Sequence, residues 1–116
     1  MDRILPPIKA LADESRLSIL WMLEDRYMCV CEIQAALELA QSTVSRHMML
    51  LEEAGFVVSQ KDGLWKNYSL NPLPPPVVGG LLSVVRLNGE ASPEAKALRE
   101  KVKAIHRENL CCRGAA

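Results

Sequence analysis

The chain has 116 residues, of which 49% are hydrophobic and 24% charged, enough for one packed domain and too few for a second of ordinary size. Its formal net charge is zero, which gives no overall support for nucleic-acid binding, although acidic side chains prevail in residues 1–57 and basic ones in residues 58–116. The chain starts without an apolar signal core, and no run approaches the roughly 20 apolar residues of a membrane span, so we expect a cytoplasmic protein without membrane contact.

Helical patterns dominate the first half of the sequence. Pro6 and Pro7 suit the opening of a short helix through Leu11, because the first helical turn needs no bonded N–H. Asp13 has the side chain typical of the N-cap of a second helix. A third helix is predicted for residues 32–39, directly after a Cys-Val-Cys segment.

The fourth predicted helix has two different faces. Ser42 is its predicted N-cap, and Gly55 can adopt the left-handed conformation that ends a helix. Val44, Met48 and Leu51 recur at spacings of four and three residues, which indicates an apolar stripe against a core. The polar side chains near the start then lie on the other side of the helix.

A β-hairpin follows this helix. The runs 56–61 and 64–70 are typical of strands, and the Asp62-Gly63 pair between them suits a turn that requires positive φ. Two short helices followed by a hairpin form a winged helix-turn-helix, so we predict a mainly α fold with a hairpin wing and five to six helices.

The segment after the prolines at 72–76 is largely apolar from Val77 to Leu87 and is expected to end at Asn88-Gly89. It either packs within its own domain or, as we favour, packs with the first helix in a homodimer, where Gly79 and Gly80 permit close approach. A last charged helix is predicted from Pro93 to about Asn109. The whole chain is read as one domain, residues 1–116, with the helix-turn-helix at about 32–54, the wing at about 56–70 and the dimerisation and C-terminal helices at about 76–110.

Small polar groups and a cation near the start of a recognition helix can reach base edges and phosphates in the major groove of double-stranded DNA. Lysines at a hairpin tip can bind backbone phosphates, and a histidine one turn along can support them. Taken singly, these residues are equally typical of a helix cap or of edge-strand charges. The candidate DNA-binding residues are Gln41, Ser42, Thr43, Ser45, Arg46, His47, Lys61 and Lys66.

Four segments resemble the ArsR/SmtB family of metalloregulatory repressors, in particular its arsenic-responsive type: LADESRLSIL (11–20), YMCVCEI (27–33), QSTVSRHMMLLEEAGFV (41–57) and DGLWKNYSL (62–70). The match covers roughly residues 4–71. The resemblance implies a homodimer that binds an inverted-repeat operator and leaves it when a metal or metalloid such as arsenite binds. A two-fold dimer places its recognition helices about 34–36 Å apart, one turn of DNA.

In a reducing compartment the four cysteines are better interpreted as metal-binding or redox thiols than as structural disulfides. Arsenic-responsive relatives carry a pair like Cys29 and Cys31, usually with a third cysteine where this chain has Gln34. Because trivalent arsenic prefers three thiolates, two thiols would chelate it less tightly, and Cys111 or Cys112 could supply the missing ligand, from the same subunit or its partner. The alternatives are small buried hydrophobic residues for the first pair and a frayed tail for the second.

The spacing of the first pair suggests how binding would act. Side chains two residues apart on an α-helix point about 200° apart, so Cys29 and Cys31 cannot both reach one atom from a regular helix. Chelation would therefore bend or unwind the start of the helix that supports the recognition helix. Couplings of this kind typically amount to about 1–3 kcal/mol.

Other functions remain open at this point. Reversible disulfides of either cysteine pair would make a redox-sensing regulator, and thiolate ligands would also suit zinc or cadmium. The fold could instead serve a thiol-rich metal carrier or an interaction module. No acid–base pair, phosphate loop or nucleophile–His arrangement indicates an enzyme, and no catalytic cofactor is expected.

Overall fold

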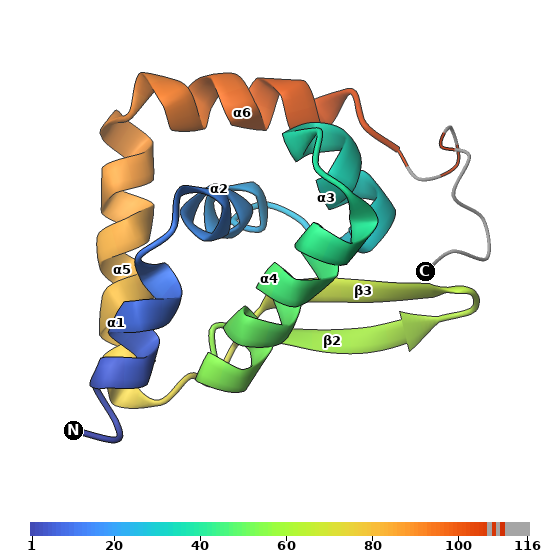
Figure 1. Ribbon diagram of the computed structural model, residues 1–116. Coiled ribbons are helices and arrows are strands. Elements are labelled where there is room, and N and C mark those ends of the chain that lie inside the picture. Colours follow the sequence, from blue (N-terminus) through green and yellow to red (C-terminus); the bar gives the residue numbers. More distant parts are fainter. Residues whose placement is uncertain (107, 109, 111–116) are drawn as a thin grey trace.

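The computed structural model describes residues 1–106, 108 and 110, and their helices and strands form the predicted winged helix-turn-helix (Figure 1). Figure 1 shows the hairpin extending away from the helices, with α5 along one edge and α6 across the top. None of the described helices is both long and apolar enough to cross a membrane. In chain order the elements are α1 (Leu5–Leu11), α2 (Glu14–Met22), β1 (Met28–Cys29), α3 (Val30–Leu37), α4 (Gln41–Ala54), β2 (Val57–Asp62), β3 (Trp65–Leu70), α5 (Pro76–Ala91) and α6 (Pro93–Lys103).

The start of α2 is capped as predicted. The Asp13 carboxylate accepts the backbone N–H of Arg16 at 3.0 Å, and its extended backbone lets the helix begin at Glu14. This hydrogen bond lowers the pKa of Asp13 below its ordinary value. The Arg16 side chain donates through Nε to the carbonyl of Ala10 at 2.6 Å, so one residue joins the end of α1 to the start of α2.

The boundaries of α3 and α4 differ from the prediction. The third helix begins at Val30 rather than Glu32, because the Glu32 side chain accepts the N–H of Cys29 in a capping box. It ends at Leu37, since Glu38 adopts the left-handed conformation (φ 57°). Ser42 is not the N-cap of α4: Ala40 occupies that position and Ser42 lies in the first turn. Gly55 ends α4 with φ 93°, as predicted.

The wing belongs to a three-stranded antiparallel sheet of order β1-β3-β2. β2 and β3 form the predicted hairpin, with Gly63 at φ 62° in its turn. The sequence analysis missed β1, in which Met28 pairs with Tyr68 and Cys29 with Asn67 of β3. The cysteine motif is therefore hydrogen-bonded directly to the wing.

The core lies between the helices and the base of the wing. The predicted apolar stripe of α4 is fully buried, with Val44, Met48 and Leu51 each at 0% exposure. These side chains fix which side of α4 faces solvent. The other large, fully buried side chains are Ile19, Leu20, Met22, Met28, Ile33, Phe56, Val57 and Val78.

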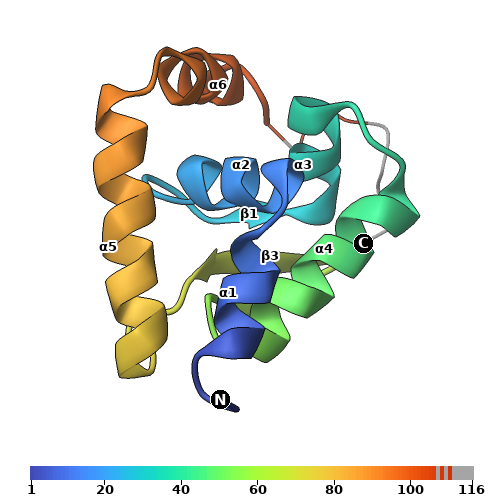
Figure 2. The same cartoon turned by 60° about the vertical axis from the view of Figure 1, so that its left-hand side comes forward.

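The last two helices also differ from the prediction. α5 continues through Asn88 and Gly89 to Ala91, and in Figure 2 it stands along one edge of the molecule. Gly89 does not end the helix but lets Trp21 approach, since a Cβ there would lie 2.9 Å from the indole Cδ1. α6 ends at Lys103, short of the predicted Asn109, which lies outside the described residues.

Candidate nucleic-acid interface and thiol site

The first turns of α4 present small polar side chains to solvent. α3 and β2 pack against this helix, and its apolar stripe holds it in the core. An exposed helix start of this kind has the shape and chemistry to enter the major groove. The structure brings together, on the exposed side of this helix, Gln41, Ser42, Thr43, Ser45 and Arg46.

His47 differs from its neighbours on α4. It is half-buried, and its Nδ1 lies 3.1 Å from a guanidinium nitrogen of Arg16. Because a guanidinium only donates, Nδ1 is the acceptor in this contact. His47 therefore joins α4 to α2, and its contact with a DNA phosphate stays a prediction.

The two predicted wing lysines face each other across the hairpin. Lys61 of β2 pairs with Lys66 of β3, and both are exposed. The Lys66 ammonium lies 5.4 Å from the ring centroid of Tyr68. Like charges directly opposite each other destabilise a hairpin. An anion bound between or beside the two lysines would reduce this repulsion.

Cys29 occupies a position that the sequence analysis did not foresee. It is both the last residue of β1 and the N-cap of α3, with an extended backbone (φ −90°, ψ 168°). Its sulfur accepts the backbone N–H of Glu32 in the capping box. The side chain is 0% exposed, and burial raises the pKa of its thiol.

The two cysteines of the motif therefore do not both lie in the helix. Cys31 stands in the first turn of α3 and is 6% exposed, whereas Cys29 precedes the helix. The predicted helix start at Glu32 left both cysteines before the helix, which is right for Cys29 and wrong for Cys31. The separation of about 200° between helical side chains two residues apart therefore does not apply to this pair. Burial imposes the stronger constraint: a ligand from solvent reaches the Cys29 sulfur only if residues around it move.

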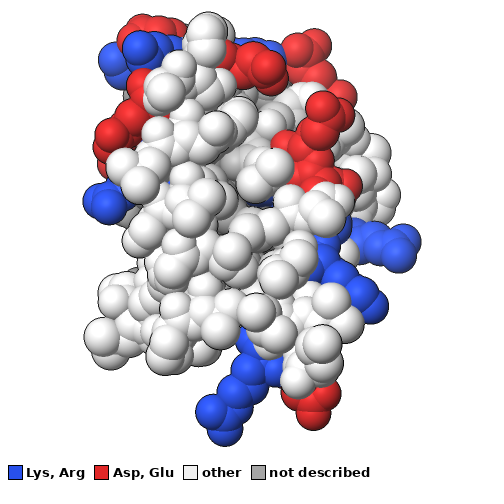
Figure 3. Space-filling view, turned by 90° about the vertical axis from the view of Figure 1, so that its left-hand side faces the viewer, with Lys and Arg blue, Asp and Glu red and all other residues white. Residues whose placement is uncertain are grey.

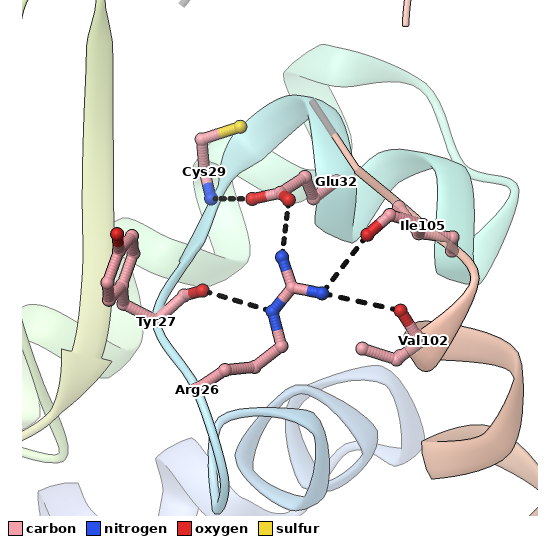
Figure 4. A network of polar contacts seen from close by, with 6 residues as sticks. All are labelled: Arg26, Tyr27, Cys29, Glu32, Val102 and Ile105. Atoms are coloured by element: carbon pink, nitrogen blue, oxygen red, sulfur yellow. Dashed lines mark hydrogen bonds and ion pairs between the residues drawn. The ribbon is translucent and has the colours of Figure 1, made fainter. Parts of the chain in front are cut away.

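Arg26 and Glu32 form a polar network beside Cys29, shown in Figure 4, that the sequence analysis missed. The Glu32 side chain accepts the Cys29 N–H through Oε1 at 3.0 Å and the Arg26 guanidinium through Oε2. Arg26 also donates to the carbonyls of Val102 at 3.3 Å and Ile105 at 3.1 Å. The spacing of Glu32, three residues after the capping residue Cys29, is typical of a capping box and could have predicted the Cys29–Glu32 contact. It gives no indication of Arg26.

The second predicted pair of thiols cannot be placed beside the first. Cys111 and Cys112 lie outside the described residues. Within the part of the chain that the structure describes, no group of three or more His, Cys, Asp and Glu side chains could hold a metal ion. Among the described residues Cys29 is a free thiol, whereas Cys31 is disulfide-bonded and becomes available to a ligand only after reduction. A further thiol ligand would come from the remainder of the chain or from a second molecule.

A face without charged side chains covers α5 and α1. Figure 3 shows it as an uncharged expanse, with charged groups gathered toward its margins. Val84 and Leu87 of α5 are each 61% exposed, and Leu5 and Ile8 of α1 are 42% and 44% exposed. An apolar surface of this kind on a small domain indicates contact with a partner.

Comparison with known proteins identifies relatives of the chain. The family model described as "Bacterial regulatory protein, arsR family" matches residues 13–59. The arsenic resistance transcriptional regulator ArsR1 of Pseudomonas putida is 41% identical over 102 residues, which cover 84% of this chain and 80% of that protein. These relatives regulate transcription and are not enzymes.

Solved structures give the same fold. Reduced HlyU from Vibrio cholerae matches with a TM-score of 0.64 and 31% identity, over 75% of this chain and 88% of that chain. The DNA-binding domain of Mb0332 from Mycobacterium bovis matches with a TM-score of 0.65 and 25% identity, over 79% of this chain and 82% of that chain. The Mb0332 domain is described as a homodimeric winged helix-turn-helix of a possible ArsR-family regulator.

Proposed function

Because this chain belongs to the ArsR family of bacterial transcriptional regulators, we propose that it is a homodimeric repressor that arsenite, or a similar thiophilic metalloid, releases from operator DNA. One observation carries the proposal. Cys29 is at once the N-cap of the helix before α4 and the ladder partner of a wing strand. A ligand on this thiol acts on both candidate DNA-binding elements.

The DNA contacts follow from the exposed groups. The polar start of α4 enters the major groove, where the Gln41 amide can both donate to and accept from an adenine edge and Arg46 can donate to a guanine edge. Lys61 and Lys66 bind phosphates beside the groove, which makes binding depend on salt. Hydroxyl groups support these contacts, from Ser42, Thr43 and Ser45. His47 holds α4 to α2 and lies near the phosphate backbone of the bound DNA.

The dimer follows from the uncharged face over α5 and α1. Two copies that bury this face about a two-fold axis present their α4 helices about 34–36 Å apart to an inverted repeat. Val84→Glu places a charge at an exposed position of the face, so the subunit should fold but sediment as a monomer. Lys96→Glu, on an exposed position of α6, is the control and should leave the dimer intact.

The thiol chemistry favours arsenite over divalent cations. Arsenous acid carries hydroxyl groups, and each thiol that replaces one of them loses its proton as part of the departing water. Zinc and cadmium bring no such leaving group, so the thiol protons that they displace must pass to solvent. The relative ArsR1 of Pseudomonas putida, which is named for arsenic resistance, supports the first route. Cys29 and Cys31 would supply two ligands, and Cys111 or Cys112 the third.

The test uses fluorescence anisotropy of a labelled duplex from the promoter of the chain's own gene, with fully reduced protein. Arsenite should release the wild type, and Cys29→Ser and Cys31→Ser should each require at least about tenfold more, as expected for a lost coupling ligand. Mass spectrometry of the wild type and of the double Cys111→Ser, Cys112→Ser variant reports whether the tail binds. If arsenite leaves operator affinity unchanged in the reduced wild type, the proposal is wrong.

Two further titrations separate the alternatives. Release by peroxide in the absence of arsenite would identify a redox-sensing regulator in place of a metalloid sensor. Release by zinc or cadmium at lower concentrations than arsenite would identify a divalent-metal sensor. If the proposed function is right, arsenite should release the protein from DNA at a lower concentration than peroxide, zinc or cadmium.

A further inference from the structure

Glu32 is the one buried charged side chain among the described residues, at 3% exposure. Both of its carboxylate oxygens are engaged, one by the Cys29 N–H and the other by the Arg26 guanidinium. A buried carboxylate is strongly unfavourable unless such donors satisfy it. Arg26 therefore stabilises the closed start of α3.

Arg26 connects this helix start to a distant part of the chain. Its guanidinium donates to the carbonyls of Val102 and Ile105, at and just beyond the end of α6, while Nε donates to the Tyr27 carbonyl at 3.3 Å. Figure 4 shows the guanidinium between the start of α3 and the segment that follows α6. One side chain thus holds the two segments together.

We propose that Arg26 and Glu32 are positioning residues that hold the start of α3 closed over Cys29, and so set the arsenite concentration at which the repressor leaves DNA. The inference rests on the proposed function. Access to Cys29 requires the start of α3 to open, and this opening withdraws the Cys29 N–H from the Glu32 carboxylate. The Arg26–Glu32 pair opposes the opening and stabilises the DNA-binding form.

Linkage fixes the direction of the effects. If the closed form binds DNA and the open form binds arsenite, any change that destabilises the closed form weakens DNA binding and strengthens arsenite binding. A residue that only supported the fold would weaken both. The two readouts therefore separate a positioning role from a structural one.

Glu32→Gln is the informative variant. It keeps the size of the side chain but removes the charge, and it turns an NH₂ group toward either Arg26 or the Cys29 N–H. Half-maximal release should need about tenfold less arsenite, the effect of losing one charge-assisted hydrogen bond, and operator affinity without arsenite should fall. Arg26→Lys keeps the charge but loses the planar fork, so it should shift both quantities in the same directions by less.

The matched control lies on the same two helices. Lys101 of α6 pairs with Glu38, at the other end of α3, at 2.8 Å, and both side chains are exposed. Lys101→Met removes a contact between α3 and α6 without touching the Cys29 network. It should leave both the operator affinity and the arsenite response unchanged.

Amide hydrogen exchange tests the connection without arsenite. In Glu32→Gln the Cys29 amide should exchange about tenfold faster, and the amides of residues 102–105 should accelerate with it. Lys101→Met should not alter the Cys29 amide. Acceleration at Cys29 alone would show that α6 is not coupled to this helix start. An unchanged Cys29 amide would overturn the inference.

The outcomes for the two proposals are distinguishable. If arsenite does not release the wild type, the proposed function fails, and the exchange rates alone decide whether Arg26 couples α3 to α6. If the wild type responds but Glu32→Gln shifts neither quantity, or weakens both, the positioning role is wrong. If Glu32→Gln does not fold, Arg26→Lys carries the same test.

Discussion

The helices α3 and α4 follow each other directly in the chain, yet their N-termini are built in opposite ways. The start of α3 is buried and closed by side chains: Cys29 and Glu32 exchange capping hydrogen bonds, and Arg26 covers the carboxylate. The start of α4 is exposed, and the side chain of Ala40 at its N-cap cannot accept a hydrogen bond. Each construction matches the work that we propose for it.

An uncapped helix start with small polar side chains suits an external anion. Its backbone N–H groups and the positive end of the helix dipole can act on a DNA phosphate. The start of α3 has already satisfied this demand internally, so its stability depends on side chains that a ligand can displace. The comparison supports our proposal that α4 recognises DNA and that α3 controls when it does so.

The largest effect on stability is expected at the closed start. Arg26→Met leaves the Glu32 carboxylate buried without its guanidinium, and should lower the free energy of unfolding by about 2–3 kcal/mol, less than for a fully buried pair since Arg26 is partly exposed. Urea unfolding at fixed protein concentration measures this. Lys101→Met should show no measurable change, and equal losses in the two variants would contradict the distinction between the pairs.

At the exposed start of α4, a capping substitution should raise stability and weaken DNA binding. Ala40→Asp supplies an N-cap, so it should stabilise the protein by about 0.5–1 kcal/mol. The same carboxylate repels the phosphate, and operator affinity should fall by about 2 kcal/mol, roughly 30-fold. Ala40→Ser caps without a charge and should cost much less affinity. If Ala40→Asp binds the operator as well as the wild type, no phosphate docks at this helix start.

Local patterns were sufficient to predict the elements of the candidate DNA-binding face. The stripe of Val44, Met48 and Leu51 fixed the orientation of α4 before any tertiary contact was known, and the Asp62-Gly63 pair located the wing. Both are short-range signals in the chain. For this reason the exposed residues on α4 were placed correctly.

The thiol site depends on contacts that no local pattern contains. β1 has two residues, too few for an alternating strand pattern, and its partner Asn67 is distant in sequence. Arg26 reaches Val102 across most of the chain, and a single arginine in a loop gives no signal of this. The start of α3 was partly predictable, but the capping side chain is Cys29, where Ser or Thr is usual.

A third helix start provides a reference for capping without any ligand. Asp13→Ala should lower the free energy of unfolding by about 1 kcal/mol at neutral pH. The Arg16 N–H lowers the pKa of Asp13 below its ordinary value of 3.8, so the stabilisation is present above that pH and is lost as the pH falls through the lowered value. Urea unfolding of both proteins across this range should show the difference shrinking. A difference that persists in acid would show that the cap does not depend on the charge.

The smallest effect is expected at Cys29 itself. Cys29→Ser keeps an acceptor for the Glu32 N–H, and serine is a favourable N-cap, so the loss of buried sulfur is largely offset and stability should change by less than about 1 kcal/mol. Cys29→Ala removes the acceptor and should be about 1 kcal/mol less stable than Cys29→Ser. Urea unfolding of the two variants under reducing conditions compares them directly. Equal stabilities would show that the Cys29 side chain does not cap α3, and a ligand on that sulfur would then have no capping hydrogen bond to displace.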